Sequence, residues 1–322
     1  MRAVADKNIV NLELFAKHAE IIALPAEKID AVAVKAADIL LTRSKTKLNS
    51  ELLAGSAVKF IGCCVTGRDH IDETFLKQAG IECYVAEGCN AQAVVDYVKI
   101  LVAGMAFSEI RGSKAAVIGV GRIGSLVADY LKSLGFEVLL CDPFRSSEPG
   151  FLHTDLAEIN DVDLISLHVP LLNNVGMLDA EFFKRQKAGA ILINTSRGEA
   201  INEKDLLEHG KHLNYYFDVF CDEPDINPDL VKMAKWVTPH IAGHSVEAKQ
   251  RGSLMVYQVA AKLFGWDCAE FTIATKPEDL QKQLRLHQAL ADKLQREIAA
   301  DPRAPGCIFQ TLRQAYWERY EF

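Results

Sequence analysis

Three residues in the second half of the chain have side chains suited to oxidising an alcohol. Arg197 lies in INTSRG, Glu223 in DVFCDEP and His240 in TPHIAG, each after a short apolar run. A base must take the hydroxyl proton as hydride leaves the same carbon, and histidine suits this role near neutral pH. A carboxylate stabilises the imidazolium that forms, and a guanidinium can bind a substrate carboxylate through two hydrogen bonds. Taken singly, each residue has an ordinary structural explanation, whereas together they indicate hydride transfer.

A glycine-rich turn precedes these residues. The apolar run 115–120 meets Gly119, Gly121 and Gly124, with Arg122 and Ile123 between the last two, and an amphipathic helical pattern follows. The spacing Gly-x-Gly-x-x-Gly allows a tight turn, a close approach of backbone to pyrophosphate, and close helix packing. The helix N-terminus then offers free N–H groups to phosphates. The turn predicts a dinucleotide site.

Asp142 ends the second apolar run of this unit, 18 residues after Gly124. An acid at about this separation hydrogen-bonds the adenosine ribose in dinucleotide-binding units. A carboxylate there would repel a 2′-phosphate, so the sequence predicts NAD rather than NADP as the cofactor.

Six strands are expected around this turn: 115–120, the run ending at 142, 164–168, 190–194, 215–219 and 236–238. Six strands are the number in a full dinucleotide-binding domain of the Rossmann type. The three catalytic candidates would all follow strands of this one sheet.

The first 88 residues alternate short apolar runs with amphipathic segments. Strands are expected at 2–6, 21–24, 38–44, 58–65 and 82–88, and helices near 8–19, 26–36, 49–54 and 73–79. Such alternation predicts a second parallel α/β sheet, without a glycine fingerprint. Polar residues after its third and fourth strands are placed to meet an anion, although a solvated basic loop is equally consistent: Arg43, Ser44, Lys45, Lys47, Thr66, Gly67 and Arg68.

Longer helices are expected at 89–108, 245–264, 276–299 and 308–319. We therefore expect a substrate domain from 1–88 and 258–275, an NAD-binding domain from 89–257, and a helical C-terminal extension from 276–322. The fold class is α/β, with two lobes. The extension is too short for a core of its own and should pack on the body or on another subunit.

Composition restricts the partners. The 322 residues are 49% hydrophobic and 25% charged, with a formal net charge of -7, so no basic face for nucleic acid is expected. No signal-peptide pattern and no apolar run of about eighteen residues is recognisable, which predicts a cytoplasmic protein without membrane association. The eight cysteines lie apart, mostly in apolar stretches, and favour free thiols over a zinc site or disulfides.

The sequence also contains residue types used in metal binding and in thiol catalysis. His240 and His244 are four residues apart, but Pro239 and Gly243 argue against the helix that would align two metal-binding rings, and no metal is expected. Cys64 and Cys221 have no recognisable base partner for nucleophilic catalysis.

The ordered motifs GVGRIG, CDP, HVPL, INTSRG, DVFCDEP and TPHIAGH resemble the D-isomer-specific 2-hydroxyacid dehydrogenases over nearly the whole chain. Early segments such as LLTRSKTKLNSELL and FIGCCVTGRDHID look most similar to the branch that oxidises 4-phospho-D-erythronate in vitamin B6 synthesis. The resemblance implies a flavodoxin-like lobe and a Rossmann lobe with the active site between them. It also implies that Arg197 holds the substrate carboxylate, Glu223 tunes the histidine and His240 is the acid/base.

The resemblance also assigns binding residues. Those for the cofactor are Gly119, Gly121, Arg122, Ile123, Gly124, Asp142, Val169, Pro170, Thr195, Ser196, Asp218 and Gly243. Those for a small phosphorylated 2-hydroxy acid are Arg43, Ser44, Thr66, Gly67 and His244. The sequence departs from that branch at Val65, where a threonine is expected, at Arg68 and at His244, where a tyrosine is expected. LRQAYWERYEF resembles a shortened dimerisation region, which implies a homodimer.

The sequence is also compatible with two other functions. One is another D-2-hydroxyacid dehydrogenase, of the phosphoglycerate or glyoxylate type. The other is a protein that binds NAD as a sensor without turnover.

Overall fold

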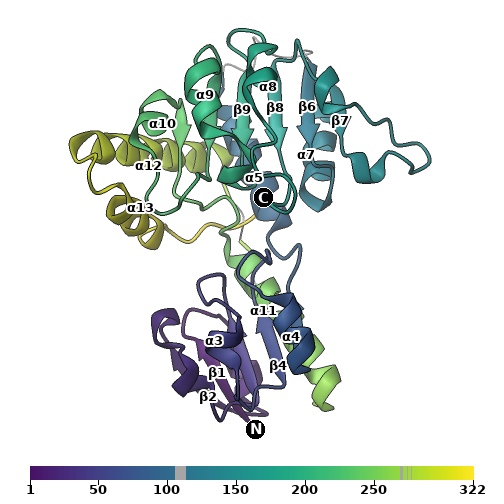
Figure 1. The fold of residues 1–322 in the computed structure, drawn as a ribbon, viewed down its shortest axis with the longest axis vertical. Helices are drawn as coiled ribbons and strands as arrows, with labels where there is room; N and C mark the ends of the chain where they lie inside the picture. Colours follow the sequence, from purple (N-terminus) through teal and green to yellow (C-terminus); the bar gives the residue numbers. More distant parts are fainter. Residues whose placement is uncertain (106–113, 269–270, 274, 277) are drawn as a thin grey trace. The chain divides into compact units, whose positions relative to one another are not determined.

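The computed structural model describes residues 1–105, 114–268, 271–273, 275–276 and 278–322. Contacts divide the chain into two compact units (Figure 1). Unit 1 contains residues 1–92, 244–277 and 319–321, and unit 2 contains residues 93–243, 278–318 and 322. Each unit is built on one parallel sheet, which is the α/β architecture expected from the sequence.

Unit 1 contains a five-stranded parallel sheet in the order β2-β1-β3-β4-β5, the order of flavodoxin. All five expected strands are present: β1 (Arg2–Asp6), β2 (Glu20–Leu24), β3 (Ile39–Thr42), β4 (Phe60–Cys63) and β5 (Glu82–Val85). The helices are α1 (Leu12–Ala16), η1 (Ala26–Lys28), α2 (Ala31–Val34), α3 (Ser50–Leu53), α4 (Glu73–Ala79) and the long α11 (Val246–Phe264).

Apolar side chains cover both faces of this sheet. Phe15, Phe60 and Tyr257 belong to one buried cluster, and Leu40 and Ile61 belong to the other. Neighbouring residues of one strand therefore point to opposite cores, as expected for a parallel sheet covered on both sides.

Unit 2 contains the six expected strands in the order β11-β10-β9-β8-β6-β7, all parallel. They are β6 (Lys114–Ile118), β7 (Glu137–Cys141), β8 (Leu164–Leu167), β9 (Ile191–Asn194), β10 (Asn214–Phe217) and β11 (Trp236–Val237). The first strand of the unit lies between the second and the third. The segment after β7 adds only an isolated bridge, between Leu140 and His153.

The helices of unit 2 include α5 (Ala91–Gly104), whose first two residues belong to unit 1, α7 (Arg122–Ser133), α8 (Ala180–Lys184), α9 (Glu203–His209) and α10 (Pro228–Met233). Single turns of 3₁₀ helix are η2 (Pro143–Arg145), η3 (Leu156–Glu158) and η4 (Gly198–Ala200). Residues 106–108 of the expected helix 89–108 lie outside the described residues. In α7, Val127, Ala128 and Leu131 are buried at helical spacing, so one face packs on the sheet.

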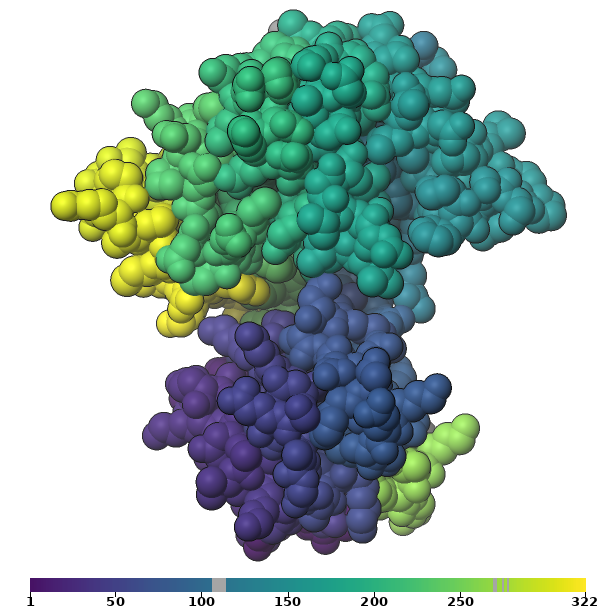
Figure 2. Space-filling view, in the orientation of Figure 1, coloured from purple at the N-terminus to yellow at the C-terminus, as the bar shows by residue number. Residues whose placement is uncertain are grey.

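The C-terminal extension forms α12 (Leu280–Ala300) and α13 (Pro305–Gln314). The last helix begins three residues earlier than expected, because proline is well suited to a first helical turn. Leu294 and Ile298 of α12 and Phe309 of α13 join the core of unit 2. In the space-filling view the yellow extension lies against the green residues of the same unit (Figure 2).

The contacts place the unit boundaries differently from the domain boundaries expected from sequence. They fall after residues 92 and 243 instead of 88 and 257, because α11 packs in unit 1 along its whole length. Residues 278–318 pack with unit 2. All eight cysteines are free thiols, four of them buried, while Cys268 and Cys307 are exposed. Among the described residues, none of the helices combines the length and apolarity needed to cross a bilayer.

Candidate active site

Arg197, Glu223 and His240 follow three neighbouring strands of unit 2. β9, β10 and β11 pair in parallel, so their carboxyl ends lie at one edge of the sheet. Arg197 comes three residues after β9, and His240 three residues after β11. The topology therefore explains why residues distant in sequence gather at one edge.

Glu223 and His240 form a direct pair. Glu223 Oε2 lies 2.7 Å from His240 Nδ1, and Glu223 Oε1 accepts the backbone N–H of Phe220 at 3.0 Å. Burial alone would raise the pKa of Glu223, but these hydrogen bonds and the charge of the imidazolium outweigh it and lower that pKa. The Glu223 side chain is 18% exposed and that of His240 34%, so the carboxylate is enclosed while the ring reaches solvent.

His240 has a left-handed backbone, with φ at 54°. A non-glycine residue adopts this conformation at a cost, which the surroundings must offset. The backbone carbonyl of Asp218 accepts the His240 N–H at 2.8 Å. Its carboxylate accepts the N–H groups of Ile241 and Ala242, both at 2.8 Å. Asp218 therefore holds the backbone on both sides of the histidine.

The Arg197 loop is held by Asn194, the last residue of β9. The Asn194 side chain accepts from the N–H and hydroxyl of Ser196, at 3.0 and 2.8 Å, and donates to the Arg197 carbonyl at 2.9 Å. A Cβ on Gly198 would lie 1.9 Å from the carbonyl carbon of Phe220. Glycine at 198 thus lets the Arg197 loop pass directly against the loop that leads to Glu223.

The glycine turn lies at the end of β6. Gly119 has φ at 83°, and a Cβ there would meet the His168 carbonyl oxygen at 2.6 Å. A Cβ on Gly124 would lie 1.9 Å from the carbonyl oxygen of Gly119. Around Gly121, the N-cap of α7, an added Cβ would meet open space among the described residues, and Gly121 has no side chain to cap the helix. This arrangement fits a dinucleotide, because the first turn of α7 is left open to a phosphate.

Asp142 lies beside this turn. Its Oδ2 accepts the N–H of Val120 at 2.9 Å, and its Oδ1 that of Phe144 at 3.2 Å. Arg145, three residues later, donates to the Val120 carbonyl at 2.7 Å. Asp142 therefore lies next to the glycine turn, as expected. Arg145 also contacts this turn, which the sequence motif did not indicate.

The other residues expected at the cofactor lie on the same sheet edge or in the loops that follow it. Val169, Thr195 and Ser196 are buried. His168 precedes Val169, and its ring contacts Ser166 Oγ at 2.8 Å and Thr195 Oγ1 at 3.4 Å. Burial lowers the pKa of His168 to about 3, so this ring is neutral at physiological pH. Pro170 is exposed, and Gly243 is partly buried.

The residues expected to bind substrate belong to unit 1. Arg43 follows β3 and donates through Nε to the buried Asp6 at 2.9 Å, while Ser44 next to it is exposed. Thr66 follows the neighbouring strand β4 and donates to Asn90 Oδ1 at 2.9 Å. Gly67 has φ at 105°. These two loops share the carboxyl edge of neighbouring strands.

Two residues that depart from the expected pattern have structural partners in unit 1. Arg68 bridges Glu87 and Glu73, at 2.6 and 2.7 Å. The His244 carbonyl accepts from Arg319 Nε at 3.2 Å.

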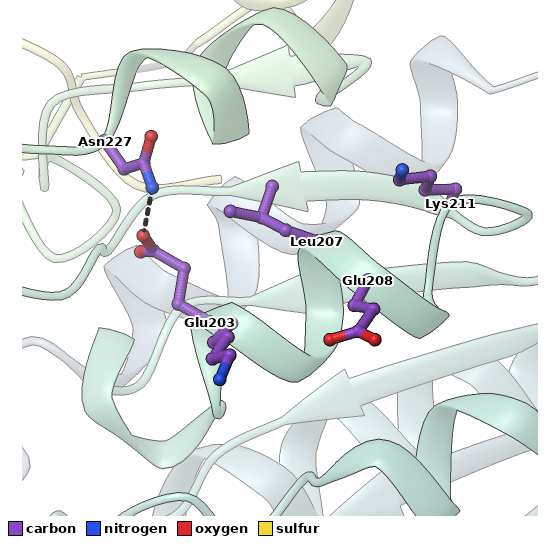
Figure 3. Close-up of a pocket in the computed structure, with 6 residues that line it drawn as sticks. Glu203, Leu207, Glu208, Lys211 and Asn227 are labelled. Carbon is purple, nitrogen blue, oxygen red and sulfur yellow. Dashed lines mark hydrogen bonds between the residues drawn. The ribbon is translucent and has the colours of Figure 1, made fainter.

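An open cavity of about 510 Å³ lies elsewhere, along α9 (Figure 3). Glu203, Leu207 and Lys211 line it, and Asn227 donates to Glu203 Oε1 at 2.7 Å. None of the residues expected to act in catalysis lines it, so this surface hollow is separate from the candidate site.

Burial raises the pKa of Cys64, and that of Cys221 to about 12, which favours the protonated thiol over the nucleophilic thiolate. Glu223 occupies Nδ1 of His240. The described part of the chain holds no group of three side chains arranged for a metal ion.

Comparison with known proteins identifies relatives. The family model described as D-isomer specific 2-hydroxyacid dehydrogenase, NAD binding domain, matches residues 97–242. The erythronate-4-phosphate dehydrogenase of Pseudomonas savastanoi pv. phaseolicola is 42% identical over 82% of this chain and 73% of its own. That of Stutzerimonas stutzeri is 34% identical over 100% of this chain and 93% of its own.

Solved structures show the same fold. NAD+-bound 3-phosphoglycerate dehydrogenase of Entamoeba histolytica superposes with a TM-score of 0.72 at 22% identity, covering 84% of this chain and 99% of that one. D-lactate dehydrogenase of Aquifex aeolicus, complexed with NAD and lactic acid, gives 0.69 at 24% identity, covering 82% and 96%.

Proposed function

The chain belongs to the D-isomer-specific 2-hydroxyacid dehydrogenases, and we propose that it oxidises 4-phospho-D-erythronate with NAD. The product is 3-hydroxy-2-oxo-4-phosphooxybutanoate, in a step of pyridoxal phosphate synthesis. The names of the relatives that match along most or all of the chain support this substrate. The family description supports NAD.

The observation that carries the proposal is the 2.7 Å contact of Glu223 Oε2 with His240 Nδ1. The lowered pKa keeps Glu223 ionised, and an ionised carboxylate only accepts hydrogen bonds. In the neutral form of the ring, Nδ1 therefore carries the proton, and Nε2 keeps its lone pair. This tautomer is the one that a general base requires.

In the proposed reaction, His240 Nε2 takes the proton of the hydroxyl beside the substrate carboxylate, and Glu223 stabilises the imidazolium. Arg197 binds the carboxylate through two parallel N–H groups and so orients the reacting carbon. Bound NAD supplies the acceptor for the hydride that leaves this carbon. In the reverse direction, His240 returns the proton to the oxygen.

The binding roles follow the same assignment. We propose that the glycine turn, Asp142, the loop 168–170, the loop 195–197, Asp218 and Gly243 contact NAD. Arg43 and Ser44 are the proposed ligands of the substrate phosphate, and Thr66, Gly67 and His244 are further proposed substrate-binding residues. We also propose that the protein is a cytoplasmic homodimer, in keeping with the C-terminal resemblance.

A substrate panel tests the proposal through the absorbance of NADH. Purified protein is expected to reduce NAD with 4-phospho-D-erythronate at a kcat/KM well above that with D-erythronate, D-glycerate or 3-phosphoglycerate. Turnover only of an unphosphorylated or shorter acid would assign the chain to another 2-hydroxyacid dehydrogenase. NAD binding without turnover of any acid in the panel would favour the sensor.

A further inference from the structure

A buried hydrogen-bonded chain runs from helix α5 to the His240 loop within unit 2. Trp236 Nε1 donates to the Tyr97 hydroxyl at 3.1 Å, and that hydroxyl contacts Thr238 Oγ1. Thr238 Oγ1 lies 2.7 Å from Asp218 Oδ1. Tyr97 and Thr238 are fully buried, and Asp218 is 1% exposed, so water does not compete for these groups.

The direction of this chain is fixed by its two ends. An indole N–H can only donate, so the Tyr97 oxygen accepts from Trp236 and its own proton is directed to Thr238. At the other end, Thr238 Oγ1 donates to Asp218 Oδ1, so the Thr238 proton is directed to the carboxyl group. Burial raises the pKa of Tyr97 well above its usual value and keeps this hydroxyl a donor.

The chain ends on the carboxylate that holds the backbone around His240. Asp218 accepts from Ile241 and Ala242 through its side chain, on the C-terminal side of a histidine with φ at 54°. A buried carboxylate that loses one donor shifts toward the donors that remain. The position of the His240 ring therefore depends on Thr238 and, through it, on Tyr97.

The C-terminal extension packs against the ring of Tyr97. The His287 ring of α12 meets the Tyr97 ring edge to face, with centroids 5.7 Å apart. His287 is itself fixed, because Nδ1 lies 2.8 Å from the Gln283 carbonyl and Nε2 lies 2.9 Å from the Tyr316 hydroxyl. The extension thus contacts Tyr97, the tyrosine of this hydrogen-bonded chain.

We infer that Tyr97 is a positioning residue for His240, and that α12 contributes to the active site by holding Tyr97 in place. The inference rests on the proposed function only for the role of His240 in turnover. The hydrogen-bonded chain itself can be tested without substrate.

Tyr97→Phe removes one hydroxyl, and Tyr215→Phe is the matched control. Tyr215 is also a buried tyrosine of unit 2, but its hydroxyl donates to the Gly210 carbonyl, away from the His240 loop. We expect Tyr97→Phe to lower kcat for 4-phospho-D-erythronate about 10- to 100-fold, because small displacements of a catalytic group have effects of this size. The KM for NAD and the kcat of Tyr215→Phe should stay close to wild type.

Amide hydrogen exchange gives the readout that needs no substrate. In the free protein, Tyr97→Phe should speed exchange in a peptide covering residues 237–243 by about tenfold, and Tyr215→Phe should not, at matched thermal stability. Unchanged exchange with Tyr97→Phe would overturn the inference. Absence of wild-type turnover would overturn only the proposed function.

Thr238 and His287 provide the second set of variants. Thr238→Ser keeps the hydroxyl and should retain the wild-type kcat, whereas Thr238→Val lacks it and should have a lower kcat. This pair of variants tests the inference even if Tyr97→Phe folds poorly. His287→Ala combined with Tyr97→Phe should cost less than the product of the single effects, because both act on one element. Equal kcat for the two Thr238 variants, or strictly multiplicative effects, would contradict the inference.

Discussion

Gly124 and Gly119 lie in contact across the glycine turn, so closely that a Cβ on Gly124 would lie 1.9 Å from the Gly119 carbonyl oxygen. This contact joins the first turn of α7 to the end of β6. It explains in space why the third glycine of the motif is needed, since a side chain there would push the helix off the sheet.

Gly124→Ala should therefore destabilise the protein. The contact is with backbone, which cannot rotate away, so we expect a loss of about 1–3 kcal/mol in the free energy of unfolding, the usual cost of overpacking. Urea denaturation, followed by tryptophan fluorescence or circular dichroism, measures this free energy. Wild-type stability in this variant would mean that α7 can shift freely.

Gly121→Ala should act on the cofactor instead. An added Cβ at Gly121 meets open space, and φ is -80°, so stability should change by less than about 0.5 kcal/mol. If the pyrophosphate approaches this backbone, the methyl group should weaken NAD binding at least about tenfold, measured by calorimetry. Unchanged affinity would place the pyrophosphate elsewhere.

Glu223→Gln should abolish most turnover without affecting NAD binding. The amide no longer stabilises the imidazolium, and it can present N–H to Nδ1 and so favour the wrong tautomer. We expect kcat to fall about 10²- to 10⁴-fold. Glu203→Gln is the matched control, because Glu203 is also partly buried but contacts Asn227. A similar decrease in kcat in both variants would contradict a specific role of Glu223 in catalysis.

Much of this arrangement was predictable from the sequence, because apolar runs mark strands and parallel strands bring their carboxyl ends together. The eleven strands in the described residues were all expected, and the positions of Arg197, Glu223 and His240 at one sheet edge followed from them. The order of strands in the sheet of unit 2 was not predictable from the sequence, because strand pairing depends on contacts between distant segments.

The supporting contacts were also beyond the sequence. Asn194 looked like the last residue of a strand, yet its side chain holds the Arg197 loop. Asp218 was expected at the cofactor, and the structure shows in addition that it binds the backbone after His240. Such roles depend on side-chain direction and on a left-handed φ at His240, which no local pattern indicates.

His168 should make stability depend on pH. Its pKa is about 3 when folded and about 6.5 when unfolded, so below pH 6.5 only the unfolded chain binds this proton. The contribution of His168 to the free energy of unfolding is therefore complete above pH 6.5. It is lost as pH falls toward 3, by at most about 1.4 kcal/mol per pH unit. Between pH 6 and 4, wild type should lose stability more steeply than His168→Asn, measured by urea denaturation, with pH 7.5 as the reference. Parallel curves would contradict a His168 that stays neutral in the folded protein.

The central claim is that His240, held by Glu223, is the base that takes the hydroxyl proton of 4-phospho-D-erythronate while NAD accepts the hydride. His240→Asn tests it most directly, because asparagine tolerates the left-handed backbone but cannot take the proton. Initial rates of NADH formation from 4-phospho-D-erythronate should fall by at least about 100-fold relative to wild type, with NAD affinity retained. A variant that turns over this substrate at the wild-type rate would contradict the account.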